Sequence, residues 1–207
     1  MEESRGRLIV FEGVDAAGKT TLCDDLCESL RNRQQPVHRY HFPGKTPGTL
    51  GELVYRIHHH HQDNFGIPTV NACALQLLHI AAHIDIIEST IKQILREGVW
   101  VVLDRFWWST YVYGRDDGVD EQSLELMIQL EKKAWGKVLP DVLFLVDPVM
   151  PLRDDESVCA AWHRKRQLYA ELIERERDSY RCAVIETERG HETRKSALEK
   201  ILREVLC

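Results

Sequence analysis

The stretch Gly13-Val14-Asp15-Ala16-Ala17-Gly18-Lys19-Thr20 decides the fold class of this chain. It has the pattern GxxxxGK[ST], it follows the apolar residues 8–11, and leucines spaced four apart follow it. Between a strand and a helix, such a loop curls so that successive backbone N–H groups face a phosphate, and the helix N-terminus adds positive charge. The stretch therefore predicts a nucleotide-phosphate site, with Lys19 at the outer phosphates and Thr20 on Mg²⁺.

Apolar runs alternate with segments of helical periodicity along the rest of the chain. We predict strands over residues 7–12, 37–42, 99–104, 142–147 and 181–185. We predict helices over 19–33, 50–60, 68–95, 109–114, 121–134, from about 157 to 178, and over 192–205. Strands that alternate with helices form a parallel sheet with right-handed crossovers, covered on both faces. The pattern favours an α/β three-layer sandwich with a mostly parallel five-stranded sheet, in one domain over residues 1–207.

Composition excludes several classes of protein. The 207 residues include 27 Lys and Arg against 33 Asp and Glu, a net charge of −6, which argues against a nucleic-acid binder but not against a small anionic substrate. Neither long apolar run approaches the roughly 20 residues that span a bilayer, and residues 1–6 lack the pattern of a secretion signal. Six scattered cysteines without CxxC spacing suit reduced thiols. We expect a cytoplasmic protein that binds neither nucleic acid nor membrane.

A second polar element follows the apolar residues 99–103. Asp104 and Arg105 come at the carboxyl end of that predicted strand, where ligands bind in open α/β sheets. Asp104 is expected to support the metal together with Thr20, and Arg105 to point into the cleft. The alternative is an aspartate that caps the next helix, followed by a surface arginine.

These motifs, in this order, resemble the thymidylate kinase family over most of the chain. The residues that carry the resemblance are the acid-bearing loop 12–15, Asp104-Arg105-Phe106, Ser109-Thr110, Tyr113 and Pro140-Asp141. Residues 104–110 also look like the corresponding stretch of the mitochondrial pyrimidine monophosphate kinases, which are thymidylate-kinase-like. The resemblance implies a P-loop fold, Mg²⁺, and transfer of the γ-phosphoryl group of ATP to a pyrimidine deoxynucleoside monophosphate, most simply dTMP. It also implies a homodimer.

The resemblance assigns roles residue by residue. Asp15 is placed between the two substrates, in contact with the acceptor sugar, and Arg105 grips the acceptor phosphate. Lys45 stands where one family pattern has an arginine, which keeps the charge but loses the bidentate geometry. The implied ATP-binding residues are Gly13, Val14, Asp15, Ala16, Ala17, Gly18, Lys19, Thr20 and Thr21. The implied acceptor-binding residues are Phe42, Lys45, His79, His83, Arg105, Ser109 and Tyr113.

Two features depart from the family pattern. His79 and His83 stand where the family has a Phe that stacks on thymine and an Arg at its edge. Three interpretations are open, in this order: the two histidines face the substrate, they are ordinary packing histidines, or their four-residue spacing forms a metal pair. The lid, around residues 148–166, is short. Because Ala16 stands where one subgroup has a catalytic arginine, we expect Arg153 to join Lys19, Asp15 and Arg105 in catalysis, with Arg164 or Arg166 as helpers.

Other residues and other functions stay open at this point. Trp107 and Trp108 either wall the acceptor pocket or pack in the core, and the histidines at 58–61 suit a solvated loop or helix end. Glu12 is expected to buttress the loop of residues 13–18, the phosphate loop. The alternatives to a dTMP kinase are a kinase for another pyrimidine monophosphate and a degenerate nucleotide-binding regulator without turnover. A GTPase switch ranks low because no guanine-specifying Asn/Thr-Lys-x-Asp is evident.

Overall fold

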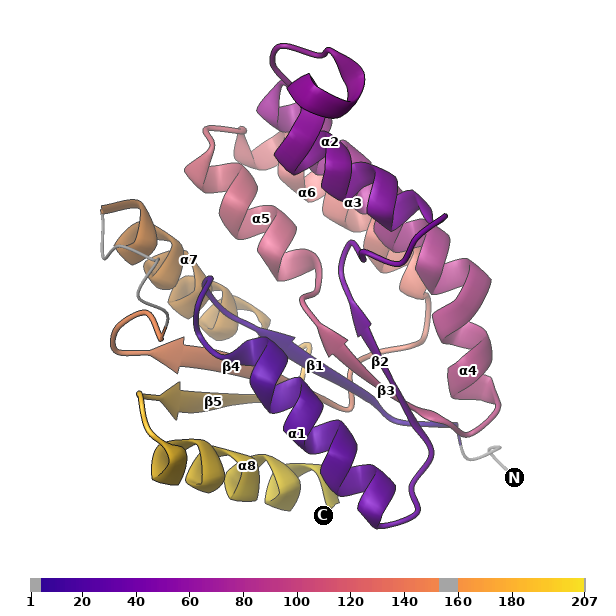
Figure 1. The fold of residues 1–207 in the computed structure, drawn as a ribbon, viewed down its shortest axis with the longest axis vertical. Coiled ribbons are helices and arrows are strands. Elements are labelled where there is room, and N and C mark those ends of the chain that lie inside the picture. The colour runs from indigo at the N-terminus through magenta and orange to yellow at the C-terminus, as the bar shows by residue number, and fades with distance from the viewer. Residues whose placement is uncertain (1–4, 153–159, 207) are drawn as a thin grey trace.

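Five parallel strands form one sheet in the order β2-β3-β1-β4-β5 (Figure 1). The computed structural model describes residues 5–152 and 160–206. The strands are β1 (Leu8–Glu12), β2 (Val37–His41), β3 (Trp100–Asp104), β4 (Val142–Pro148) and β5 (Cys182–Thr187). All five residues of β1 are buried, because helices cover both faces of the sheet, which explains why the central strands are apolar up to the acidic residues near their carboxyl ends. The predicted five-stranded α/β sandwich is confirmed.

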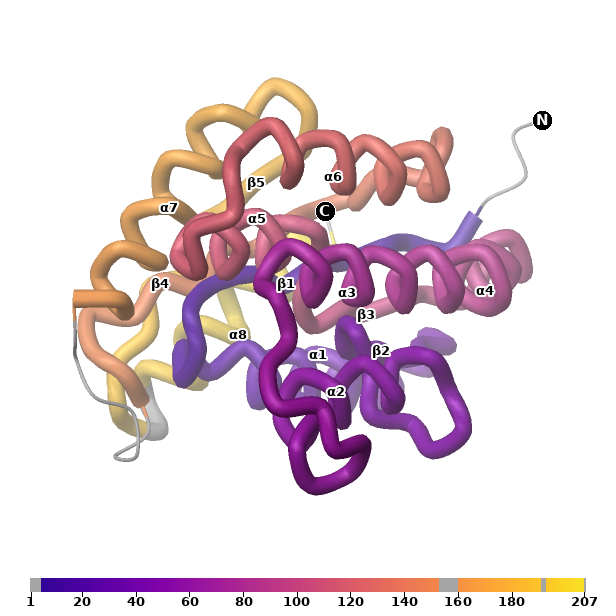
Figure 2. Tube along the Cα trace, turned by 90° about the horizontal axis from the view of Figure 1, so that it is seen from above, coloured from indigo at the N-terminus to yellow at the C-terminus, as the bar shows by residue number. Residues whose placement is uncertain are grey.

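Helices form the outer layers on both faces of the sheet, as the view from above in Figure 2 shows. They are α1 (Lys19–Asn32), α2 (Leu50–Phe65), α3 (Ala72–Ile86), η1 (Ile87–Ile91), α4 (Lys92–Arg96), α5 (Trp107–Asp116), α6 (Glu121–Trp135), α7 (Ala160–Glu176) and α8 (His191–Leu206). Helices α1 and α8 pack together on one face, whereas α5 and α7 pack together on the other. Helix α3 contacts α2, α5 and α6, so these four helices form a group at one end of the molecule (Figure 1).

The position of β1 fixes where a ligand can bind. The chain leaving β1 passes to β2 and β3 on one side of it, whereas the chain leaving β3 passes to β4 on the other side, so the strand order reverses at β1. In open α/β sheets, ligands bind outside the carboxyl ends of the strands at such a reversal. The loop of residues 13–18 leaves β1 at this edge and leads into α1, and β3 ends beside it.

The predicted strand limits agree with the structure within about two residues, and the larger differences concern helices. The helix predicted over 68–95 begins at Ala72, because the Asn71 side chain accepts from the N–H groups of Cys73 and Ala74. It continues through a π-helical segment, η1, without a break, since the junction residues keep right-handed helical angles. The helix predicted over 50–60 extends to Phe65 past a kink at His60.

The structure places four large apolar side chains in the core. Ile87 and Ile91, within the helix predicted over 68–95, are completely buried, so neither is available to a second copy of the chain. Trp107 and Trp108 are also completely buried, so both pack in the core and neither walls a pocket. Within residues 5–152 and 160–206, every helix is too short or too polar to cross a bilayer.

Candidate active site

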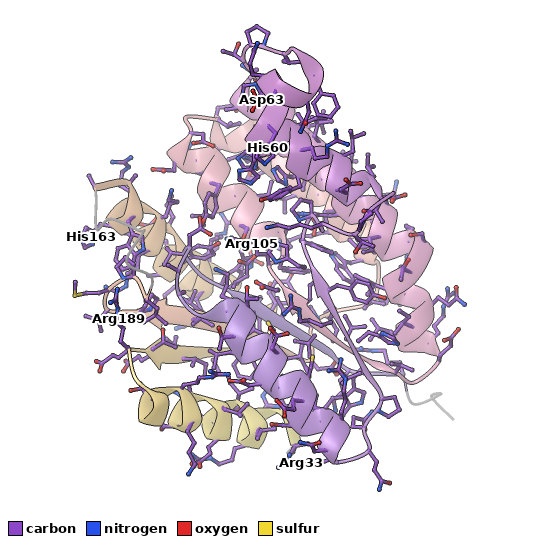
Figure 3. All side chains as sticks on the ribbon, viewed as in Figure 1. Arg33, His60, Asp63, Arg105, His163 and Arg189 are labelled. Carbon is purple, nitrogen blue, oxygen red and sulfur yellow. The ribbon has the colours of Figure 1, made fainter. Side chains whose placement is uncertain are left out.

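A cavity of about 840 Å³ opens at the carboxyl edge of the sheet. It extends from the phosphate loop and the first turn of α1, past the ends of β2 and β3, to α2, α3 and α5. Figure 3 shows Arg105 near the middle of the molecule, whereas His60 and Asp63 lie toward the outer end of α2. The cavity therefore connects the predicted phosphate site to the predicted acceptor site.

The loop of residues 13–18 has a backbone that only certain residues allow. Gly13 has a φ of 141°, and a Cβ there would lie 2.3 Å from the carbonyl oxygen of Val146, so β4 leaves room only for glycine. Gly18 is left-handed, with a φ of 89°, and begins α1 without a side-chain cap among the described residues. The first N–H groups of α1 are thus left for a phosphate, as the motif predicts.

Lys19 lies folded against the loop that precedes it. Its Nζ donates to the carbonyl oxygens of Gly13 and Val14 at 2.8 and 2.7 Å. Burial, together with the nearby Arg105 charge, lowers the pKa of Lys19 to about 8. An anion at the loop would offset both effects, so the ammonium group is poised to turn toward a phosphate.

Thr20 and Asp104 form an oxygen pair between α1 and β3. The Thr20 hydroxyl donates to Asp104 Oδ2 at 2.6 Å, and the His41 ring lies 3.3 Å from the same oxygen. The other oxygen, Oδ1, is buried without a hydrogen-bond partner in the described structure. Burial opposes the charge of Asp104, but the His41 hydrogen bond and the Lys19 charge outweigh it and lower its pKa. A buried, ionised oxygen without a partner fits a cation such as Mg²⁺.

Arg105 points into the cavity because its backbone is left-handed, with a φ of 76°. Non-glycine residues hold this conformation at some energetic cost, typically at functional sites. Its guanidinium donates to Ser109 Oγ at 3.0 Å and forms an ion pair with Asp15. Burial opposes ionisation of Asp15, but the charges of Arg105 and Lys19 and the hydrogen bond from Tyr113 bring its pKa down to about 2. The predicted residues Asp15, Arg105, Ser109 and Tyr113 are thus brought together.

Glu12 holds this group in place from below. Its carboxylate accepts from the backbone N–H groups of Phe106 and Ser109 at 2.7 and 2.9 Å and from Ser109 Oγ at 2.7 Å. Tyr169 on α7 also donates to Glu12, at 3.1 Å. Glu12 thus joins β1 to the start of α5, directly after Arg105, whereas the sequence led us to expect that it supports the phosphate loop.

The far end of the cavity is lined by aromatic rings. His79 and His83 both face it, from successive turns of α3. His83 Nδ1 hydrogen-bonds to buried Glu131 at 2.8 Å, and its ring stacks on Phe42 with centroids 4.2 Å apart. Burial and the neighbouring His83 hold the pKa of His79 well below its usual value, so His79 is neutral at pH 7. Phe42 thus supports His83, while the exposed Lys45 lies over the ring of Tyr55 at the rim.

The histidines at 58–61 occupy the second half of α2, which partly corrects the expectation of a solvated run. His58 is half-buried against α3, where its Nδ1 lies 3.2 Å from His79 Nε2. His59 and His60 are exposed. In the described part of the chain, no group of three or more His, Cys, Asp or Glu side chains is arranged to hold a metal, so the structure gives a His79–His83 metal pair no third ligand.

The arginines expected in the lid have different positions. Arg153 lies outside the described residues. Arg164 pairs with Asp116 at 2.9 Å and Arg166 with Asp147 at 2.5 Å, and neither lines the cavity. Arg189, which the sequence gave no reason to select, does line it.

Other residues of the site also lack a sequence motif. Gln76, Tyr55 and His58 line the cavity, and none was predicted. For Gln76 a signal existed: it lies three and seven residues before His79 and His83, on the same face of the predicted helix. Tyr55 and His58 reach the site only because α2 packs against α3.

Comparisons with known proteins agree on one family. The thymidylate kinase family model matches residues 11–195. Thymidylate kinase of Cupriavidus taiwanensis is 32% identical over 213 residues, covering 96% of this chain and 98% of that protein. Thymidylate kinase of Chlorobium chlorochromatii is 34% identical over 160 residues, covering 76% of this chain but only 65% of that protein. A crystal structure of thymidylate kinase from Ehrlichia chaffeensis has the same fold, with a TM-score of 0.74 over 98% of this chain and 100% of that chain at 24% identity.

Proposed function

Because the chain belongs to the thymidylate kinase family, we propose that it transfers the γ-phosphoryl group of ATP to dTMP, giving ADP and dTDP. The observation that carries the proposal is a single cavity with the phosphate loop at one end and a ring-lined recess at the other. Arg105 lies between the two, where an acceptor phosphate would meet the outer phosphate of ATP.

The reaction requires positioning and charge neutralisation more than proton transfer. An oxygen of the dTMP phosphate, already anionic near pH 7, attacks the γ-phosphorus, and the bond to the β,γ-bridging oxygen breaks, so that ADP leaves. Lys19 and the N–H groups of the loop neutralise charge on the transferred group. Asp15 lies beside Arg105 and Tyr113, where it would accept a hydrogen bond from the acceptor sugar.

Thr20 and Asp104 are the residues that would hold Mg²⁺, directly or through water. When bound, Mg²⁺ would neutralise charge on the β- and γ-phosphate oxygens. Until then Thr20 hydrogen-bonds to Asp104, which keeps the two side chains on the same side of the loop.

Arg105 would grip the acceptor phosphate. Its guanidinium group already donates to Ser109 and Asp15, so the orientation of this group is fixed before the substrate binds. Pre-ordering of this kind reduces the entropy lost when the acceptor binds. A lid around residues 148–166 would close over the phosphates and exclude water, with Arg153 as the arginine that neutralises the transition state.

The proposal includes a homodimer in the cytoplasm. Leu77 on α3 and Leu126 and Leu130 on α6 are 48%, 58% and 52% exposed, and α3 and α6 pack side by side. Exposed leucines on neighbouring helices suit a contact between two copies of the chain. The described cysteines are free thiols, which suits a reducing compartment.

The function is tested by coupling ADP formation to an optical readout with a panel of nucleoside monophosphates. We expect turnover with dTMP, and weaker turnover with other pyrimidine monophosphates. Absence of turnover with every acceptor, together with retained ATP binding, would instead support a nucleotide-binding regulator.

A further inference from the structure

Gln76 is a buried polar side chain for which the described structure provides no hydrogen-bond partner. It is 3% exposed, it lies on α3, and it lines the cavity. Because this side chain lines the cavity and has no hydrogen bond within the described protein, its amide is available to a molecule bound there. The atoms that would satisfy this amide are expected in a ligand.

The structure makes room for this side chain at Gly114 on α5. A Cβ at residue 114 would lie 3.2 Å from Gln76 Cγ and 2.5 Å from Leu124 Cδ2. Gly114 follows Tyr113, whose hydroxyl donates to Asp15 at 2.6 Å. The glycine at residue 114 therefore lets Gln76 pack closely against α5, the helix that carries Tyr113.

Each of the two histidines beside Gln76 has one ring nitrogen paired within the protein. His83 uses Nδ1 for Glu131, and His79 uses Nε2 for His58. The Gln76 amide, in contrast, offers two donors and a carbonyl acceptor in one plane. A pyrimidine imide presents a carbonyl next to a ring N–H, which an amide matches with one hydrogen bond in each direction.

On the basis of the proposed function, we propose that Gln76 is a specificity residue that binds the imide edge of the acceptor base. Its NH₂ group donates to the O4 carbonyl of thymine, and its carbonyl accepts from N3–H. His79 and His83, from the same face of α3, supply ring surface beside it.

The test combines a change in the protein with a change in the ligand. Gln76→Leu keeps the bulk and removes the amide, and 4-thio-dTMP replaces O4 with sulfur, a weak hydrogen-bond acceptor. The matched control is Gln129→Leu, at an exposed position of α6. For each protein, kcat/KM is measured for dTMP and its 4-thio analogue, with calorimetric binding of both and a thermal melt to check folding.

We expect the wild type and Gln129→Leu to prefer dTMP over the analogue by about fivefold, the scale of one hydrogen bond. We expect Gln76→Leu to lose about tenfold in kcat/KM for dTMP, to leave the KM for ATP unchanged, and to show a preference near one. An active wild type whose preference persists in a folded Gln76→Leu protein would overturn this inference alone. A wild type that neither binds nor phosphorylates dTMP would overturn the proposed function, and this inference with it.

Discussion

The hydroxyl of Thr20 lies 2.6 Å from Oδ2 of Asp104, although 84 residues separate them in the chain. The hydrogen bond joins the first turn of α1 to the end of β3 and leaves Asp104 Oδ1 buried without a partner in the described structure. A cation would satisfy this oxygen. We therefore expect the Mg²⁺ dependence of turnover to change most when Asp104 is substituted.

Asp104→Asn keeps the shape of the side chain but removes its charge. Since the ionised carboxylate is what would hold Mg²⁺, we expect turnover to fall by about 10–100-fold and the Mg²⁺ concentration for half-maximal rate to rise. Titration of Mg²⁺ against initial rate measures both effects. Asp63→Asn, on the exposed end of α2, is the control. An unchanged Mg²⁺ dependence would remove Asp104 from the metal site.

Lys19 predicts a pH dependence of ATP binding. Burial lowers its pKa to about 8, so the free protein loses the ammonium charge as the pH rises through that value. ATP is fully ionised by then, so we expect its affinity to fall between pH 7 and 9.5. The usual lysine pKa is 10.5, so the native state releases this proton before the unfolded chain does, and the free energy of unfolding should rise from about pH 8 to 10.5.

Calorimetric titration of ATP at several pH values checks this prediction. Lys19→Met has no ammonium group, so its weaker ATP affinity should be nearly constant over the same range. An equally steep decline in that variant would assign the pH effect to another group.

Arg105→Ala should weaken the acceptor far more than ATP. The guanidinium is fixed by Ser109 and Asp15 in the middle of the cavity, so its loss leaves the acceptor phosphate without a counter-charge. We expect kcat/KM for dTMP to fall by about 100-fold, with a much smaller change in the KM for ATP. Arg177→Ala is the control, because Arg177 is exposed, pairs with Glu174 and does not line the cavity. A selective rise in the KM for ATP would show that Arg105 serves the other substrate.

The double variant His79→Phe and His83→Arg should increase the preference for dTMP over other pyrimidine monophosphates by about tenfold. Glu131, now 2.8 Å from His83 Nδ1, would pair with the arginine and hold it at the base edge. The measurement is the ratio of kcat/KM values for dTMP and dCMP, with His163→Phe on the exposed part of α7 as the control. A ratio equal to that of the wild type would mean that these histidines only pack the helix.

Much of the fold and of the phosphate end of the site could be predicted from the sequence. A glycine-bracketed loop has few conformations, and the strand before it fixes where Lys19 and Thr20 go. Asp104 and Arg105 were predictable because parallel strands end at one edge of the sheet. Local pattern and topology were therefore enough for this half of the cavity.

The acceptor end depends on how the helices pack. His58 belongs to the site only because α2 lies against α3, and Gln76 packs beside Gly114 of α5, where a Cβ would lie 3.2 Å from its Cγ. An apolar pattern such as that of Ile87 and Ile91 fits an exposed contact as well as a core, and only the packing of η1 against α6 and their place in the core cluster decide between the two. Contacts between elements of this kind leave no motif in a single sequence.

Transfer of label from [γ-³²P]ATP tests the central claim most directly. The protein is incubated with labelled ATP, Mg²⁺ and dTMP, and the nucleotides and inorganic phosphate are separated by chromatography, with Lys19→Ala as the blank. We predict that the label appears in dTDP in proportion to ADP formed, with little inorganic phosphate, and that the blank is slower by orders of magnitude. Label found only in inorganic phosphate, or in dTDP at the same rate in the blank, would contradict the account.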